Sequence, residues 1–319
     1  MEQLKGSFFL CCAFTFAGTS VISARFVSGE LGTFTITMAS LFFAILSLLP
    51  LCRNKLIKTI LIMSATDWLM LLLQALFGIF LFRMFLLQGL LHTSSGEAGI
   101  LTGATPAATA LLAWGILKES INKYSLTGIL CTIGGILLIE GILLPGSSLS
   151  PEHSIGNLLV LCAVICESLF SIFSRMNILR DVSCLKHPLD PIVQTTLVSG
   201  FAFLLCLIPS LFEHPILSLM SLGIKGWLSL IWYGMFVTAL AFIFWYAGIK
   251  RCSAYTAAAF SGMMPFTSLI LSVVVLGEVY QWQQWSGGAL VILGMFLIGK
   301  HQIIDTPSQK SDLSKEVLL

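Results

Sequence analysis

Long apolar stretches separated by short polar segments recur along the whole chain. A helix needs about 20 apolar residues to cross the hydrocarbon core, and its backbone groups must be bonded within the segment. The stretches are continuous and do not alternate with a period of two, which favours helices over barrel strands. The pattern predicts an all-α membrane protein with ten transmembrane helices. These span residues 6–27, 31–51, 68–89, 95–115, 123–144, 156–177, 192–212, 227–248, 253–275 and 281–299.

The composition narrows the class of protein further. Of the 319 residues, 57% are hydrophobic and only 10% are charged, against about 25% charged residues in soluble domains. This excludes a soluble enzyme, a disordered chain and a secreted disulfide scaffold. The net charge of +2 and the lack of a basic cluster argue against nucleic acid as a partner. The nine cysteines form no CxxC motif, so we expect neither a metal site nor a cofactor.

The basic residues predict the orientation. With ten helices and an inward N-terminus, all of the 17 lysines and arginines except Arg25, Arg83 and Lys225 fall on the cytoplasmic side. We therefore expect a multi-pass protein of the cell inner membrane with both termini in the cytoplasm.

The chain contains an internal repeat. A shift of 159 residues places segment 89–139 on segment 248–298. The matched positions are Gly89 with Gly248, Ser94 with Ser253, Ala98 with Ala257, Gly103 with Gly262, Pro106 with Pro265, Glu119 with Glu278, Gly128 with Gly287 and Gly135 with Gly294. Five helices per half is an odd number, so the second half is predicted to be inverted, as in secondary transporters. The expected organisation is a first repeat at 1–144, an external linker at 145–155, a second repeat at 156–299 and a cytoplasmic tail at 300–319.

The runs "GATPAATALLAWGILKE" and "GMMPFTSLILSVVVLGE" resemble the EamA domain of the drug/metabolite transporter superfamily, present twice. The resemblance implies ten helices, a central cavity lined mainly by helices 1, 3, 4, 6, 8 and 9, and export of small metabolites such as amino acids. Members often carry a tryptophan in the middle of helices 1 and 6, where this chain has Ala17 and Glu167. They also often carry a basic residue in helix 2, which is missing here. The substrates assigned to other members of the family are therefore not assigned to this chain.

Glu167 is the strongest candidate for function. An ionisable group near the bilayer centre costs a few kcal/mol unless it faces protein or water. Ser171 and Ser174 follow on the same helical face, which is typical of a cavity lining. Glu167 is interpreted as a proton-coupling carboxylate or as the counter-charge to a substrate amine. The alternative is a protonated glutamate that only joins two helices.

Arg83 and Glu97 form a second candidate, because both are expected in the outer half of the membrane. Pairing with each other would lower the burial penalty of both groups and make a structural gate. Left unpaired, Arg83 would suit a substrate carboxylate. Both alternatives remain open on sequence grounds.

Prolines and aromatic residues complete the candidates. Pro106 and Pro265, beside Gly103 and Gly262, predict hinges, because a mid-helix proline frees the carbonyl four residues earlier. The alternative is a permanent bend. Trp232 and Tyr233 lie deep in the eighth helix and are candidates for cavity lining or for packing. Glu119 and Glu278, at equivalent helix ends, favour a structural role.

These features predict a secondary transporter of small amine-bearing metabolites, working by alternating access with protons as a possible coupling ion. One alternative is an importer or exchanger of S-adenosylmethionine-like metabolites. The other is a membrane scaffold or enzyme that does not transport. The sequence contains no phosphate-binding loop or hydrolase motif to favour an enzyme.

Overall fold

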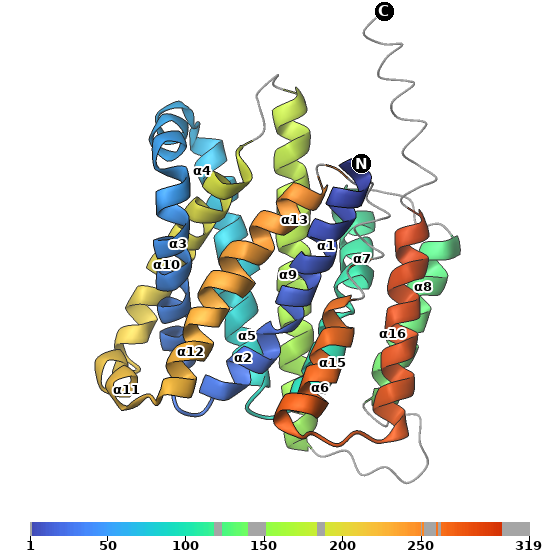
Figure 1. Ribbon diagram of the computed structural model, residues 1–319. Helices are drawn as coiled ribbons and strands as arrows, with labels where there is room; N and C mark the ends of the chain where they lie inside the picture. Colours follow the sequence, from blue (N-terminus) through green and yellow to red (C-terminus); the bar gives the residue numbers. More distant parts are fainter. Residues whose placement is uncertain are drawn as a thin grey trace, which may run out of the picture.

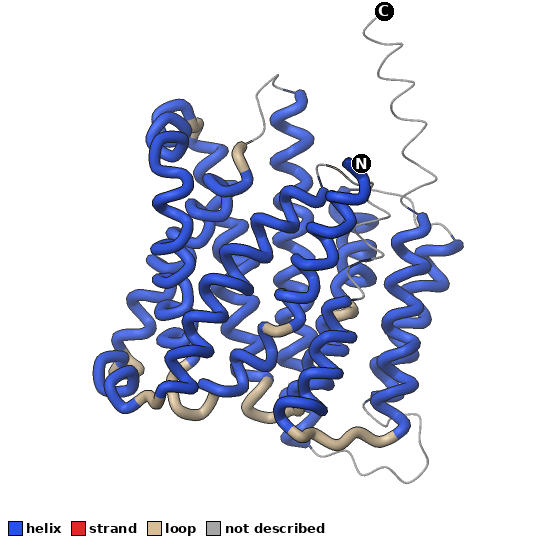
Figure 2. Tube along the Cα trace, in the orientation of Figure 1, coloured by secondary structure: helices blue, strands red, loops and turns tan. Residues whose placement is uncertain are grey.

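The computed structural model describes residues 2–117, 123–139, 151–183, 189–249, 251, 260 and 263–301. Within these ranges the chain is a bundle of helices and contains no strand (Figure 2). Seven helices are long and apolar enough to cross a membrane. They cover Leu4–Val27, Thr33–Ile62, Ala65–Gly89, Ser95–Ile116, His153–Ser174, Pro191–Leu211 and Ile224–Gly248. Lys123–Ile139 and Met263–Leu276 are shorter apolar helices, so the described residues give seven candidate spans and do not confirm the predicted ten.

The helices run up and down the bundle in chain order (Figure 1). We call the end where α1 begins and α16 ends the terminal face, and the end that carries segments 28–32, 90–94, 212–223 and 277–281 the opposite face. The first half contains α1 (Glu2–Gly18), α2 (Ser20–Val27), α3 (Thr33–Ile62), α4 (Ala65–Ala75), η1 (Leu76–Leu81), α5 (Phe82–Gly89), α6 (Ser95–Thr102), α7 (Thr105–Leu117) and α8 (Lys123–Ile139). The second half contains α9 (Pro151–Ser183), α10 (Pro191–Leu211), α11 (Pro215–Ser221), α12 (Ile224–Trp232), η2 (Tyr233–Leu240), α13 (Ala241–Ile249), α15 (Met263–Leu276) and α16 (Trp282–His301).

Two helices are longer than predicted. The span predicted at 31–51 continues to Ile62 in α3, and the one predicted at 156–177 extends from Pro151 to Ser183 in α9. Hydropathy detects only the part that matches the hydrocarbon, whereas polar residues beyond it still form intrahelical hydrogen bonds. Helix α9 therefore takes up the last five residues of the predicted linker 145–155.

Small residues hold α8 against α16. A Cβ added at Gly135 would lie 2.6 Å from the carbonyl oxygen of Gly287, and one at Gly128 would lie 2.7 Å from that of Gly294. Glycine lets the two backbones approach this closely, which is how helices associate where water provides no hydrophobic drive. The contact joins the last helix of the first half to the last helix of the second.

Helices α3 and α10 are bound at both ends. At the terminal face, Lys55 Nζ lies 2.7 Å from Asp190 Oδ2. Partial burial opposes ionisation of Asp190, but the bonds from Lys55 and the Ile192 N–H lower its pKa. At the opposite face, the Glu213 carboxylate accepts hydrogen bonds from the first N–H groups of α3, at Phe34 (3.1 Å) and Thr35 (2.7 Å).

The glycine contact gives a stability prediction. Gly135→Val should lower the free energy of unfolding by about 1–3 kcal/mol, because the added side chain forces the backbones apart. Gly134→Val is the matched control, since a Cβ there meets nothing within 4 Å. Thermal unfolding of the purified variants in detergent measures both. Equal melting temperatures for the two variants would contradict the close α8–α16 contact.

Candidate functional site

Two membrane passes contain π-helical turns at equivalent places. Adding 159 to the limits of η1 (76–81) gives 235–240, which lies within η2 (233–240). A π-turn leaves backbone groups poorly matched and is frequently found at functional sites. Each half of the chain thus contains one irregular turn, and the side chains around the two turns form the candidate site.

Arg83 lies just after η1 and is buried, with 4% of its surface exposed. Its Nη1 donates a hydrogen bond to Ser40 Oγ at 2.8 Å, and its Nη2 donates to Thr238 Oγ1 in η2. The guanidinium lies 4.2 Å from the centroid of the Tyr233 ring, which attracts a cation to its face. We call these four residues the Arg83 cluster. It draws on three passes, α3, α5 and η2.

No carboxylate pairs with Arg83 among the residues that the structure describes. Glu97 lies in the first turn of α6 and bonds to other groups, including His153, so the pair considered from sequence does not form. The Tyr233 hydroxyl is buried and has no hydrogen-bond partner. Arg83 is therefore a buried cation held by neutral groups.

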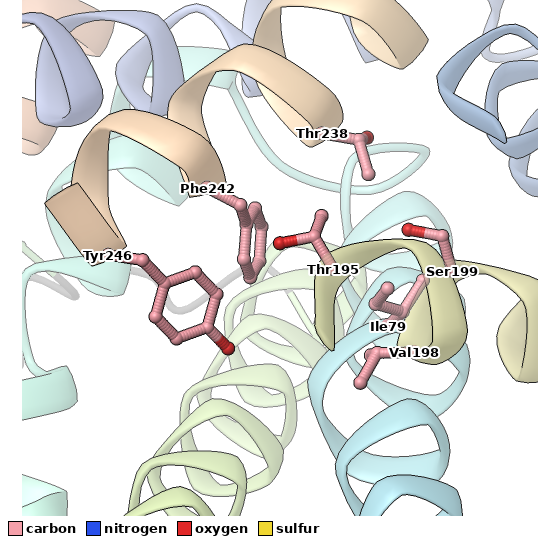
Figure 3. Close-up of a pocket in the computed structure, with 7 residues that line it drawn as sticks. All are labelled: Ile79, Thr195, Val198, Ser199, Thr238, Phe242 and Tyr246. Carbon is pink, nitrogen blue, oxygen red and sulfur yellow. The ribbon is translucent and has the colours of Figure 1, made fainter. Parts of the chain in front are cut away.

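A small cavity adjoins the Arg83 cluster, with which it shares Thr238. Figure 3 shows the residues that line it. The volume that the centre of a water molecule can occupy in this cavity is about 10 Å³. This leaves room for about one water molecule. Its walls come from η1, α10, η2 and α13. The lining residues are Ile79, Thr195, Val198, Ser199, Thr238, Phe242 and Tyr246. Thr238 belongs to both the cavity and the cluster, and the buried Ser199 hydroxyl has no partner.

Glu167 lies in α9 and is half-buried. Its Oε2 is 2.8 Å from Thr105 Oγ1, which is also 2.8 Å from the carbonyl oxygen of Thr102. A hydroxyl has one proton to donate, and a carbonyl can only accept. Both bonds therefore exist together only when Glu167 carries a proton and donates it to Thr105. Among the described residues no lysine, arginine or histidine pairs with Glu167.

The two predicted serines lie on α9 with Glu167, but neither hydroxyl contacts its carboxylate. Ser171 Oγ donates to the Glu167 backbone carbonyl at 3.2 Å. Ser174 Oγ is buried without a partner. Phe170, between them and Glu167, packs on the cavity residue Phe242 with ring centroids 6.2 Å apart. This ring contact connects the Glu167 region to the cavity.

The predicted hinge lies at a true interruption. Helix α6 ends at Thr102 and α7 begins at Thr105, and the carbonyl freed by Pro106 accepts the Thr105 hydroxyl. A Cβ added at Gly103 would lie 3.2 Å from Pro265 Cγ, so predicted hinge residues of both halves lie close together. Gly262 lies outside the described residues, as does Glu119.

The two predicted aromatic residues take different positions. Tyr233 is 1% exposed beneath Arg83, whereas Trp232 is 37% exposed. Trp232 Nε1 donates to Thr19 Oγ1 at 2.9 Å, and its ring stacks on Phe236 at 4.4 Å. Trp232 thus packs η2 against the first pass.

Several residues of the site were missed from sequence. Ser40, Thr105 and Thr238 are hydroxyl residues inside apolar stretches, where hydropathy gives them little weight. His153 falls within the predicted linker 145–155 but lies in the first turn of α9. In the repeat Thr238 is the equivalent of Ile79 in η1, so the first half offered no signal for it.

Comparison with known proteins matches this chain to a family of transporters. Residues 4–141 and 154–300 both match the EamA-like transporter family. The uncharacterized transporter YetK of Bacillus subtilis (strain 168) is 30% identical over 298 residues, covering 93% of this chain and 87% of YetK. A probable amino-acid metabolite efflux pump of Salmonella typhimurium is 25% identical and covers 64% of this chain and 67% of its own.

Two further similarities are more distant. A probable terminal-alkyne amino-acid exporter of Streptantibioticus cattleyicolor is 24% identical, with 77% of this chain and 80% of its own covered. A protein solved by crystallography shares the fold with a TM-score of 0.59 at 18% identity, covering 92% of this chain and 94% of its own.

The Tyr233 hydroxyl, which is buried without a hydrogen-bond partner, gives a prediction about stability. Tyr233→Phe should raise the free energy of unfolding by about 1–3 kcal/mol, because it removes a buried group that lacks a hydrogen bond. Tyr233→Leu should instead destabilise the protein, since the ring face beneath Arg83 is lost. Thermal unfolding in detergent ranks the two variants. A less stable Tyr233→Phe protein would mean that the hydroxyl has a bonding partner.

Proposed function

Because the chain belongs to the EamA-like transporter family, we propose that it is a secondary transporter of small amine-bearing metabolites, such as amino acids. The observation that carries the proposal is a pair of ionisable groups at membrane depth, Arg83 and Glu167. Neither has an oppositely charged partner among the described residues. Such groups are costly in a membrane and usually mark a transport pathway.

A zwitterionic solute supplies both missing charges. Its carboxylate suits Arg83, whose guanidinium has N–H groups beyond the two bonded to Ser40 and Thr238. Its ammonium suits the carboxylate form of Glu167. The small cavity and the Phe170–Phe242 ring contact lie between Arg83 and Glu167. Because this cavity is smaller than an amino acid, the closed arrangement has to open to admit a solute.

Glu167 is also the proposed proton carrier. The hydrogen bonds of Thr105 are complete when Glu167 is protonated. Loss of that proton leaves a carboxylate that attracts an ammonium group, so proton release and solute binding are coupled at one side chain. Alternating access then uses the hinge at Gly103 and the two π-turns as the flexible points.

The proposed topology has ten passes, which adds α8, α15 and α16 to the seven long apolar helices. The terminal face is cytoplasmic and the protein resides in the inner membrane, in line with the basic residues predicted on that side. The 1–144 and 156–299 segments are the two inverted repeats. Export is the proposed direction, since two relatives are named as an exporter and an efflux pump.

Transport in proteoliposomes tests the proposal. Labelled amino acids should be taken up by the wild type faster with an imposed pH gradient, and Glu167→Gln should remove the gradient dependence. Arg83→Gln should weaken apparent affinity about 10- to 100-fold, the effect of losing a hydrogen bond to a charged group.

A matched control and a solute panel complete the experiment. Glu30→Gln makes the same chemical change at an exposed loop carboxylate and should leave transport unchanged. The panel contains an amino acid, its decarboxylated amine and its deaminated acid, and the zwitterion should be preferred. Equal transport by wild type and Glu167→Gln at every gradient would assign Glu167 a structural role and end the coupling proposal.

A further inference from the structure

A second carboxylate-centred cluster lies at the opposite face, far from Glu167. Glu97 is 3% exposed. Its Oε2 lies 2.5 Å from His153 Nε2, 3.3 Å from Thr93 Oγ1 and 3.4 Å from Asn157 Nδ2. Its Oε1 accepts a bond from Gln284 Nε2 at 2.9 Å. We call these five residues the Glu97 cluster.

The cluster ties the two halves together. Glu97 belongs to α6 of the first half, whereas His153 and Gln284 belong to α9 and α16 of the second half. Glu278 adds to the closure, because its carboxylate accepts the first N–H groups of α6 at Ser95 and Gly96, each at 3.1 Å. These bonds must break before α6 can separate from the second half at this face.

Only one donor in the Glu97 cluster can change its charge. Thr93, Asn157 and Gln284 are neutral at every pH, whereas histidine titrates between about pH 5 and 8 in proteins. The His153 side chain is 40% exposed, so protons from the medium reach it while Glu97 stays enclosed. Among the described residues, the other titratable or charged groups around this cluster are His92 before α6, Glu278 and Tyr280 before α16, and Arg25 of α2, which donates to the Leu90 carbonyl.

We propose that Glu97 and His153 form a proton-binding site at the opposite face, and that the bound proton holds this face closed. With His153 protonated, a cation faces the enclosed carboxylate in a short hydrogen bond. With His153 neutral, only a hydrogen bond remains, and bonds between charged groups are roughly twice as strong. Lower pH at this face therefore favours the closed arrangement.

This site is distinct from the coupling site of the proposed function. Residues 153 and 167 are 14 positions apart on α9, which is about 21 Å along a helix. The inference uses alternating access, so it rests on the proposed function for its purpose. Its test measures opening of the face and requires no solute.

Thiol labelling of the full-length protein in detergent measures the opening. Ser95→Cys places a thiol at a buried position beside Glu97, and Gln281→Cys places one at an exposed position of the same face. A charged maleimide reacts faster with both as pH rises. The ratio of the two rates, after subtraction of the labelling of unsubstituted protein, removes the pH dependence of thiol ionisation that both positions share.

The labelling rate of Ser95→Cys divided by that of Gln281→Cys should rise about fivefold from pH 5.5 to 7.5, because the hydrogen bond between two charged groups becomes one with a neutral histidine. His153→Gln keeps an amide donor for Glu97 but cannot titrate, so its ratio should not change with pH. Glu97→Gln should give a high ratio at both values. His214→Asn is the matched control, because His214 is an exposed histidine of the same face, and it should keep the full pH response.

The outcomes separate this inference from the proposed function. An unchanged pH response in His153→Gln would overturn the proton site, whatever is transported. Loss of the response in His153→Gln together with a normal response in Glu167→Gln supports two separate proton sites. A folded His153→Gln protein, shown by an unaltered thermal transition, is required for either reading.

Discussion

The absence of water in the hydrocarbon core is the constraint on which this structure depends, because every backbone group freed at a helix break must be bonded inside the protein. In the described part of the chain, one pass is broken between α1 and α2 and another between α6 and α7. At the first, Ser268 Oγ donates to the carbonyl of Gly18 at 2.7 Å. At the second, Thr105 donates to the carbonyl of Thr102. Short hydroxyl side chains therefore make the breaks tolerable, and one of them reaches Glu167 as well.

The same constraint explains the helix ends. Glu213 and Glu278, both from the second half, accept the free N–H groups of α3 and α6 in the first half. A carboxylate at a helix N-terminus also interacts favourably with the helix dipole. Each bond does two things at once, since it completes a helix and joins the halves. The helix bundle is consequently interlocked between its halves instead of being two separate domains.

The sequence was sufficient to predict an all-helical membrane protein and the break at Gly103, because hydropathy and proline chemistry are local properties. The predicted number of ten spans was not confirmed, since seven described helices are long and apolar enough to cross a membrane. It was also sufficient to single out Arg83, Glu97 and Glu167, since ionisable residues are rare in apolar stretches. It did not identify their partners. Which side of a helix meets which neighbour depends on packing between passes, so the bond of Glu97 to His153, instead of Arg83, required coordinates. The π-turns were missed for a similar reason, because their sequences remain apolar and helix-forming.

The close contact of α8 with α16 has a consequence for how the protein is made. Helix α8 ends at Ile139, but its partner begins only at Trp282. During synthesis the glycine face of α8 enters the membrane long before α16 exists, and lipid has to cover it in the meantime. The first half cannot reach its final packing until the last helix has been inserted. Assembly of this transporter is therefore completed after translation of the whole chain, and a product truncated before α16 would leave this face open to other proteins of the membrane.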